Sequence, residues 1–205
     1  RRAELGEIHR LWRQVRSRQG TRMLTVIGEP GMGKSRLFEQ FLGAADLGDA
    51  AAPNAWQLRC VEAMSATAFH PVIERLPLLL GMPGSSDEGS SRALRDLELR
   101  CAKLGLHDDD AVILLASLLG LPLPASGASL LAGMSPARRR SRTMETLVAL
   151  LAALAATGGP LLLVVEDLHW ADASTLAWLQ ACLAELAESP VLILCSARHE
   201  FEPPW

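Results

Sequence analysis

The stretch Gly28-Glu29-Pro30-Gly31-Met32-Gly33-Lys34-Ser35 decides how the rest of this sequence is understood. It has the G-x-x-x-x-G-K-[ST] spacing of a phosphate-binding loop. The apolar run 23–27 precedes it, and residues 36–42, which have helical spacing, follow it. A strand, a glycine-rich turn and a helix in this order direct several backbone N–H groups and the positive end of the helix at one point. The stretch therefore predicts that the chain binds a nucleoside triphosphate.

Each residue type in this loop suits a role in holding phosphate. Glycine permits backbone angles and close approaches that a side chain would block. The lysine supplies a charge for the β- and γ-phosphates, and the serine an oxygen for Mg²⁺. The alternative, an ordinary Gly/Pro turn, is disfavoured by the flanking strand and helix. The expected nucleotide contacts are Gly28, Glu29, Pro30, Gly31, Met32, Gly33, Lys34, Ser35 and Arg36.

A second candidate feature is the apolar run 161–165, which ends in Glu166 and Asp167. Opposite a phosphate loop, one carboxylate can hold Mg²⁺ and the other can orient or deprotonate the attacking water. By position, Glu166 takes the metal role together with Ser35, and Asp167 takes the water-activating role. Asp followed by Glu is the commoner order, so the shorter activating acid predicts slow turnover. Two exposed acids that begin a turn are the alternative.

The end of the last apolar run, 191–196, offers a further catalytic candidate. Arg198 follows this run and could contact the γ-phosphate and report its presence; a surface arginine is an equally weighted alternative. Ser196 is a weaker candidate for the same role. After the acids, Trp170 is expected to pack, and Asp172 or Ser174 to cap a helix. Contact of His169 with the substrate water is the less favoured interpretation of that residue.

Composition limits the possible function classes. The 205 residues are 49% hydrophobic and 21% charged, which is ordinary for a soluble globular domain. A formal net charge of −3 offers no electrostatic argument for nucleic acid or an anionic membrane. The four cysteines have no C-x-x-C spacing, which suits a reducing cytoplasm, and residues 1–5 lack the apolar core expected of a signal peptide. The uncharged stretch 146–165 is broken at 157–160, which favours a buried helix and a strand over a membrane span.

Alternating apolar strands and helices predict an α/β fold of three layers, with a parallel sheet covered by helices on both faces. Ligands bind such sheets at the carboxyl ends of the strands. We expect a single domain over 1–205, with an N-terminal helix at 3–17, a nucleotide-binding core at 22–62 and 142–198, and a helical insert at 68–135. Surface connections are expected at 43–54 and 81–91, an irregular crossing from Leu121, and a solvated face for the arginines at 138–142. The expected strands are 23–27, 56–61, 161–165 and 191–196, and the remaining helices are 36–45, 70–80, 91–104, 110–119, 135–156 and 174–187.

The residues at 28–37, Gly-Glu-Pro-Gly-Met-Gly-Lys-Ser-Arg-Leu, resemble the phosphate loop of the signal-transduction ATPases with numerous domains, in the AAA-like branch of P-loop ATPases. The stretch 164–176, Val-Val-Glu-Asp-Leu-His-Trp-Ala-Asp-Ala-Ser-Thr-Leu, is similar to the second acidic motif of that group. The stretches 69–74, 135–140 and 196–205 resemble the version found beside class III adenylate/guanylate cyclase domains. Related domains also occur in large LuxR-type regulators.

This resemblance implies a cytoplasmic switch that uses ATP and Mg²⁺ and binds ATP or ADP. It implies partners within the parent protein, namely a cyclase, kinase or DNA-binding effector and helical repeats. We expect no membrane and no direct nucleic-acid contact, and a nucleotide-dependent oligomer is an open alternative. The resemblance places the strand before Arg198 between the phosphate-loop strand and the acidic strand. The family has a glycine just before the segment at 1–5 and continues past Trp205 into a fifth strand and a helical lid. The chain is thus expected to be an excised fragment whose phosphate-loop strand is a sheet edge.

The favoured interpretation is an ATP-binding, slowly ATP-hydrolysing regulatory switch domain of a signalling protein, linked to a nucleotide cyclase. One alternative is a nucleotide-binding interaction module without turnover. Another is the ATPase part of a DNA-binding transcriptional regulator, although no helix with a basic recognition face is evident.

Overall fold

The computed structural model describes residues 2–44, 54–82 and 90–205. The chain forms two compact units, one made of residues 1–71 with 154–205 and the other of residues 72–153. Most of the two expected surface connections, at 45–53 and 83–89, lies outside the described residues.

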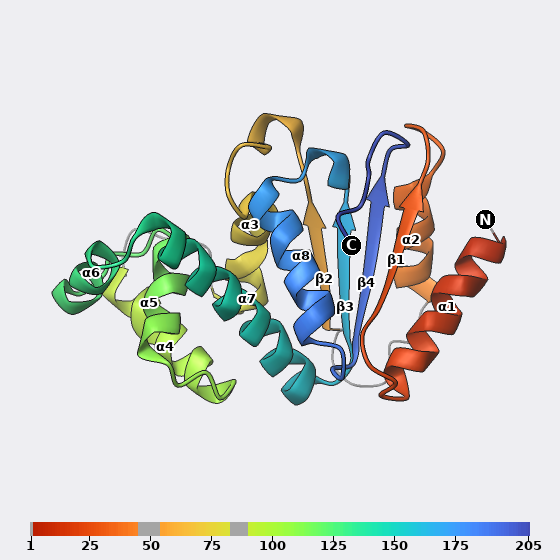
Figure 1. The fold of residues 1–205 in the computed structure, drawn as a ribbon. Helices are drawn as coiled ribbons and strands as arrows, with labels where there is room; N and C mark the ends of the chain where they lie inside the picture. The colour runs from red at the N-terminus through yellow and green to blue at the C-terminus, as the bar shows by residue number, and fades with distance from the viewer. Residues whose placement is uncertain (1, 45–53, 83–89) are drawn as a thin grey trace. The chain divides into compact units, whose positions relative to one another are not determined.

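A parallel sheet forms the centre of the first unit (Figure 1). Its strands in the described residues are β1 (Arg22–Ile27), β2 (Asn54–Arg59), β3 (Leu161–Glu166) and β4 (Val191–Ala197). Their order across the sheet is β1-β4-β3-β2, and every neighbouring pair is parallel. The predicted α/β fold and the predicted position of β4, between the phosphate-loop strand and the acidic strand, are therefore confirmed.

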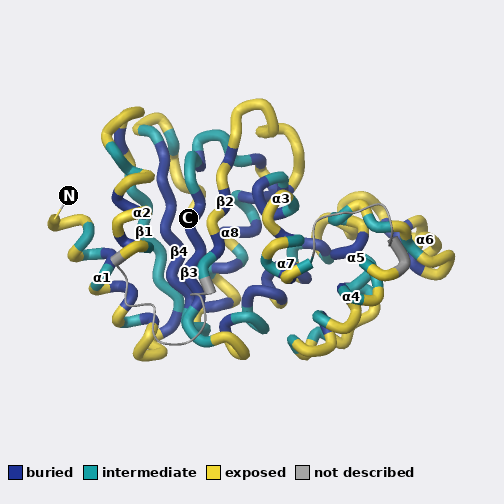
Figure 2. The backbone as a smooth tube through the Cα atoms, turned by 180° about the vertical axis from the view of Figure 1, so that it is seen from behind, coloured by how far each residue is buried: buried dark blue, intermediate teal, exposed yellow. Residues whose placement is uncertain are grey.

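Burial along the strands follows from the helices that cover the sheet. Helices α1 (Arg2–Arg16) and α2 (Lys34–Ala44) cover one face, and α8 (Ala173–Glu185) covers the other (Figure 1). Strand β4 is buried along its whole length, and β3 is buried up to Glu166. Strand β1 is only half-buried because it lies at the sheet edge, as expected, and Figure 2 shows this difference.

The helix α1 packs through the apolar face that its spacing predicts. Ile8, Leu11, Trp12 and Val15 recur every three or four residues and are all buried. They share one core with α2 and with alternate residues of β3 and β4. The indole of Trp12 meets the ring of Phe41 edge-on at a centroid distance of 6.4 Å. This packing anchors α2, and therefore the loop before it, against the central strands.

The second unit is helical. Helix α3 (His70–Leu79) leads into it with Pro77 inside the helix, and α7 (Pro136–Gly158) leads out of it. Between them lie α4 (Ser90–Lys103), α5 (Asp109–Leu118) and α6 (Ala125–Ala132). Gly159, at φ 83°, separates α7 from β3, as the break in the uncharged stretch predicts. No helix in the described ranges is long and apolar enough to cross a membrane.

Helix α6 corrects the expected irregular crossing after Leu121. A run of eight residues rich in Ala, Ser and Gly has little helical periodicity, so its sequence did not indicate a helix. Tertiary packing determines it instead: a Cβ atom at Gly127 would lie 2.6 Å from the Cδ1 atom of Ile113, so the two helices meet at a glycine. Two short 3-10 helices, Glu62–Met64 and Leu168–Trp170, were also missed because three residues carry no period.

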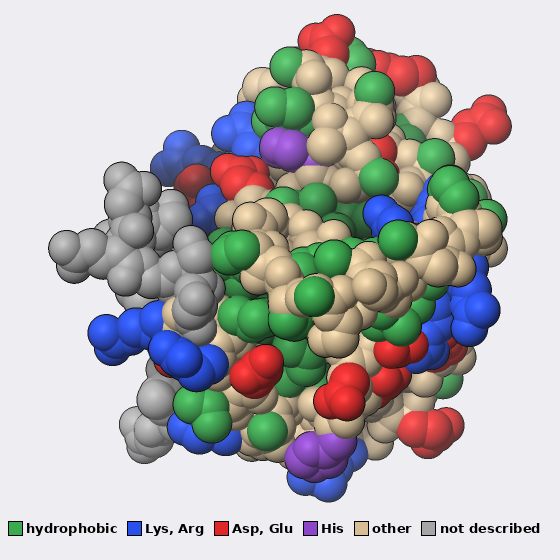
Figure 3. Space-filling view, turned by 90° about the vertical axis from the view of Figure 1, so that its left-hand side faces the viewer, with side chains coloured by type: hydrophobic (Ala, Val, Ile, Leu, Met, Phe, Trp, Pro, Cys, Tyr) green, Lys and Arg blue, Asp and Glu red, His purple; other side chains and the backbone are tan. Residues whose placement is uncertain are grey.

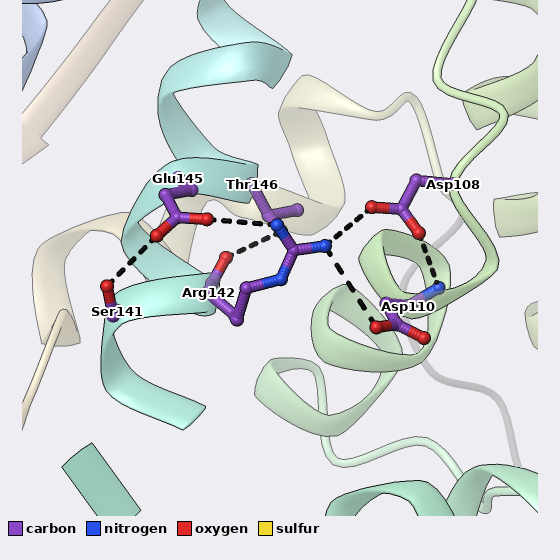
Figure 4. A network of polar contacts seen from close by, with 6 residues as sticks. All are labelled: Asp108, Asp110, Ser141, Arg142, Glu145 and Thr146. Carbon is purple, nitrogen blue, oxygen red and sulfur yellow. Dashed lines mark hydrogen bonds and ion pairs between the residues drawn. The ribbon is translucent and has the colours of Figure 1, made fainter. Parts of the chain in front are cut away.

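Arg142 corrects the expectation of a solvated arginine face, because its guanidinium joins α7 to the start of α5 (Figure 4). It donates to the Asp108 carboxylate at 2.7 Å and to the Glu145 carboxylate at 2.9 Å. Asp108 also caps α5 by accepting from the backbone N–H of Asp110. Partly exposed pairs of this kind contribute up to about 1 kcal/mol each. The network links α7 to α5 within this unit.

Candidate functional site

The phosphate loop lies between the end of β1 at Ile27 and the first residue of α2, Lys34. Gly31 has φ 78° and Gly33 has φ 81°, a backbone region in which a residue with a Cβ atom is strained. The backbone N–H of Gly28 donates to the carbonyl of Ala197 at 3.2 Å, which ties the loop to the end of β4. The first turn of α2 has no acidic residue to offset its positive end. The loop geometry therefore fits an anion.

Lys34 spans the loop that it follows. Its ammonium donates to the carbonyls of Gly28 at 2.6 Å and Glu29 at 3.0 Å. The Met32 sulfur accepts from the backbone N–H of Glu29 at 3.3 Å, while the Met32 side chain is mostly exposed. An ammonium has three donors, so one remains for a phosphate oxygen while both carbonyls stay bound. The residues present thus fit a phosphate group.

The acidic motif lies at the same edge of the sheet, two strands away from β1. Asp167 follows β3 with φ 60° and ψ 45°, the left-handed region. Its backbone N–H donates to the buried hydroxyl of Ser196 at 3.1 Å. A non-glycine residue in such a conformation costs on the order of 1 kcal/mol or more and persists only where neighbours hold it. Ser196, expected as a weak γ-phosphate reporter, thus holds the backbone of the candidate water-activating acid.

Arg59 is a charged group at this edge that the sequence interpretation missed. It ends β2 opposite Glu166 in the strand register, and its Nε atom lies 3.5 Å from the Oδ2 atom of Asp167. The Asp167 side chain is 30% exposed, so the pair is open to water. In the sequence Arg59 is only a single arginine at the end of an apolar strand. Its contact with Asp167 becomes evident only when β2 is paired with β3.

Glu166, the candidate metal ligand, ends β3 and is half-buried. Its backbone carbonyl accepts from the N–H of Cys60 at 2.9 Å. Burial, together with the negative charges of Asp172 and Asp167, raises the pKa of the Cys60 thiol to about 12. This thiol is therefore no nucleophile near neutral pH.

Arg198 leaves the end of β4, between the phosphate-loop strand and the acidic strand. Its guanidinium carbon lies 5.5 Å from the ring centroid of Trp170, within the range of a cation–π contact. One guanidinium nitrogen lies 3.9 Å from the Glu200 carboxylate. The arginine is therefore held at the carboxyl edge of the sheet by an aromatic surface from the acidic motif.

His169 lies among the charged groups of this edge. Its ring packs against Trp170 at a centroid distance of 5.0 Å, and both ring nitrogens are buried. Burial is the largest cause that lowers the pKa of His169, and the positive charges of Arg198 and Lys34 lower this pKa as well. The negative charges of Asp167 and Glu200 raise it. The charges that act on this imidazole thus come from the phosphate loop, the acidic motif and the segment at the end of β4.

Asp172 anchors the segment that follows the acidic motif. Its buried carboxylate caps α8 by accepting from the backbone N–H groups of Ser174 and Thr175 and from the Thr175 hydroxyl. The same carboxylate accepts from the N–H of Phe69 at 3.1 Å. Of the two expected cap residues, Asp172 and Ser174, Asp172 is therefore the one that caps α8. It also binds the acidic motif to the segment after β2.

No three His, Cys, Asp or Glu side chains in the described parts of the chain converge as a metal cage would require. A magnesium ion at this edge would be held by few protein ligands and by phosphate and water oxygens, which is how Mg²⁺ is usually bound with nucleotides. Ser35, exposed at the start of α2, and Glu166 are the residues that fit this role.

A separate hollow of about 430 Å³ lies within the helical unit. Figure 3 shows one face of the molecule, on which apolar side chains are bordered by acidic ones. No sequence motif marks this hollow. Its lining is Glu98, Ala102, Leu106, His107, Asp109, Val112, Ile113, Pro124 and Ser126.

Comparison with known proteins places this arrangement in a family. The chain is 27% identical over 202 residues to Uncharacterized protein R02095 of Rhizobium meliloti (strain 1021), covering 98% of this chain and 18% of that protein. The chain thus spans less than a fifth of the length of this relative. No solved structure matches this chain. Residues 1–194 match the model of the AAA ATPase domain. This match covers the phosphate loop, the acidic motif and all but the end of β4, and the chain therefore belongs to the AAA ATPase domain family.

Proposed function

We propose that this domain binds ATP with Mg²⁺ and hydrolyses it slowly, as a regulatory switch within a larger signalling protein. The observation that carries the proposal is the arrangement at one edge of the sheet: the loop spanned by Lys34 is tied to the end of β4 by the N–H of Gly28, and the Ser196 hydroxyl of β4 holds Asp167. A cationic phosphate-loop residue, a carboxylate and a second cation at the end of β4 are what hydrolysis of a terminal phosphate requires.

Each residue takes a role that follows from its position. The loop amides and Lys34 bind the β- and γ-phosphates, and Ser35 and Glu166 hold the magnesium ion. The Asp167 carboxylate orients the attacking water and accepts its proton. Its fixed backbone conformation, held by Ser196, keeps this carboxylate at the end of β3. Bound magnesium would neutralise part of the phosphate charge and so favour attack by water.

Arg198 is proposed to report the γ-phosphate. Its guanidinium lies on Trp170, which belongs to the acidic motif. A γ-phosphate bound by Lys34 would attract the guanidinium, and its loss would release it. The nucleotide state would thereby change the contact between the end of β4 and the acidic motif, which is the movement a switch needs.

The context of the whole protein is also proposed. The relative is more than five times longer than the stretch it shares with this chain, which supports a domain embedded in a larger protein. The stretches 69–74, 135–140 and 196–205 resemble domains found beside nucleotide cyclases, and they support a cytoplasmic protein with a cyclase effector. Residues 68–135 would form a helical insert in a single ATPase domain.

The test combines calorimetry with phosphate release. Wild-type protein is titrated with ATP, GTP and ADP with and without Mg²⁺, and Lys34→Ala, Glu166→Gln and Asp167→Asn are compared. We expect Lys34→Ala to lose nucleotide affinity, Glu166→Gln to lose the magnesium dependence, and Asp167→Asn to bind ATP but release no phosphate. Absence of ATP binding by the wild-type protein would refute the proposal.

A nucleotide-binding module without turnover is the second candidate. It is favoured by the Asp167 carboxylate, which faces Arg59. This carboxylate would have to give up part of that contact to activate water. Phosphate release by the wild-type protein equal to that of Asp167→Asn, with ATP still bound, would identify this second function.

A further inference from the structure

The imidazole of His169 has hydrogen-bonding groups that nothing in the described chain satisfies. Both ring nitrogens are shielded from solvent and have no hydrogen-bond partner among the described residues. A neutral imidazole carries one donor and one acceptor, so both are unsatisfied here. Buried polar groups in native proteins nearly always have a partner. The unsatisfied nitrogens therefore point to a ligand group.

The surroundings of the ring identify the chemistry of this ligand. Trp170 packs against the ring at 5.0 Å. Two cations act on the ring, Lys34 from the phosphate loop and Arg198 from the end of β4. The two nearby carboxylates are those of Asp167 and Glu200. Asp167 lies 3.5 Å from Arg59, and the exposed Glu200 has only a loose contact of 3.9 Å with Arg198. An anion bound by Lys34 and Arg198 would present its oxygens to the imidazole.

We propose that His169 is a direct contact of the terminal phosphate, donating its ring N–H to a γ-phosphate oxygen and so distinguishing ATP from ADP. This inference rests on the proposed nucleotide binding and adds a third contact to those of Lys34 and Arg198. In ADP the oxygen that accepts from the ring is missing, and both nitrogens stay unsatisfied. The imidazole thus favours the triphosphate state.

The electrostatics of the site suit a neutral donor. Burial and two neighbouring cations lower the pKa of His169, so the ring is neutral at physiological pH. A neutral N–H satisfies a phosphate oxygen without placing a third positive charge beside Lys34 and Arg198. The imidazole thus supplies a neutral side-chain donor in addition to the ammonium of Lys34 and the guanidinium of Arg198.

The decisive variant is His169→Phe, which keeps a ring against Trp170 and removes both nitrogens. We expect its affinity for ATP to fall by about tenfold or more, as for the loss of a hydrogen bond to a charged group, and its affinity for ADP to stay within about twofold. Its melting temperature should equal or exceed that of the wild type, since two buried unsatisfied atoms are gone. A residue that only packs would show no selective loss of ATP affinity.

Two further variants complete the design. His169→Gln keeps an N–H donor and should recover part of the preference for ATP. His199→Phe, at an exposed histidine beside Arg198, is the matched control and should leave both affinities unchanged. If His169→Phe prefers ATP over ADP as strongly as the wild type does, the inference is overturned and the proposed function is left intact.

A measurement without any substitution gives an independent test. In ¹⁵N-histidine spectra of the wild-type protein, ATP with Mg²⁺ should shift a ring nitrogen of His169, and ADP should not. The spectrum of His169→Gln assigns the signal. Equal shifts with ATP and ADP, when calorimetry shows that both bind, would overturn the γ-phosphate contact alone. If neither nucleotide binds, the proposed function fails as well.

Discussion

The Nε atom of Arg59 lies 3.5 Å from the Oδ2 atom of Asp167, so the last residue of β2 faces the acid that follows β3. The two residues are far apart in the sequence and meet because β2 pairs with β3 in parallel register. The arginine is mostly exposed, which makes the pair weak and reversible. This contact competes with water for the candidate water-activating carboxylate.

Replacing Arg59 should therefore change the rate of ATP hydrolysis more than stability. We expect Arg59→Gln to raise phosphate release by about twofold to fivefold, because a pair of this exposure is worth up to about 1 kcal/mol and its loss frees the carboxylate for water. Phosphate release at saturating ATP measures the effect. Arg92→Gln, which breaks an exposed pair with Asp96 in the helical unit, is the control. A lower rate in Arg59→Gln would mean that the arginine assists the acid.

Replacing glycine with alanine should have opposite effects on stability at Gly31 in the phosphate loop and at Gly6 in α1. A Cβ atom would meet nothing within 4 Å at Gly31 or at Gly6, so steric contact is excluded at both. Gly31 has φ 78°, and Gly31→Ala should lower the free energy of unfolding by about 1–2 kcal/mol. Gly6 lies in α1, and Gly6→Ala should raise it by about 0.5–1 kcal/mol. Urea denaturation measures both, and equal shifts would contradict the left-handed conformation of Gly31.

The buried cap at Asp172 should contribute more than a surface cap. Asp172→Ala removes the acceptor of three backbone N–H groups and one hydroxyl. Loss of a cap costs about 1 kcal/mol, and the buried donors left unsatisfied add a further 1–3 kcal/mol, so we expect about 2–4 kcal/mol in urea denaturation.

The control for this cap is Asp172→Asn, which keeps one acceptor oxygen for the backbone donors. It should retain most of the stability lost in Asp172→Ala. An equally large loss in both variants would show that the negative charge, rather than the hydrogen-bond geometry, stabilises the segment.

The raised pKa values of the buried thiols predict how the free energy of unfolding depends on pH. Burial raises the pKa of Cys60 to about 12 and that of Cys101 to about 11, against about 9 for an exposed thiol. Between about pH 9 and these values, unfolded thiols ionise while folded thiols stay protonated. The raised pKa of each thiol therefore contributes stability that is present below pH 9 and is lost as pH rises toward 11 and 12.

Denaturation at several alkaline pH values checks this prediction. The free energy of unfolding should fall above about pH 9, and replacing Cys60 with Ala should reduce the slope. Alkylation at pH 8 should likewise be slow in the folded protein and rapid in urea, because only the thiolate reacts. Fast labelling of the folded protein would contradict the burial of these thiols.

Local pattern was sufficient for the elements that carry the nucleotide. The spacing at 28–35 identified the loop, and the glycines at 31 and 33 have the positive φ values that such a turn requires. Apolar continuity predicted β3 and β4 as central strands, and both are buried. The position of β4 between β1 and β3 came from resemblance to a family, because periodicity carries no information on strand order.

Long-range packing decided which side chains meet. The sequence determined a phosphate loop and an acidic strand end, since a strand, a turn and a helix are set by neighbouring residues. The tertiary structure alone brought Ser196 to the N–H of Asp167, Arg59 to its carboxylate, and Arg198 to the ring of Trp170. These contacts depend on the order and register of parallel strands. That order is a property of the whole core and not of any one segment.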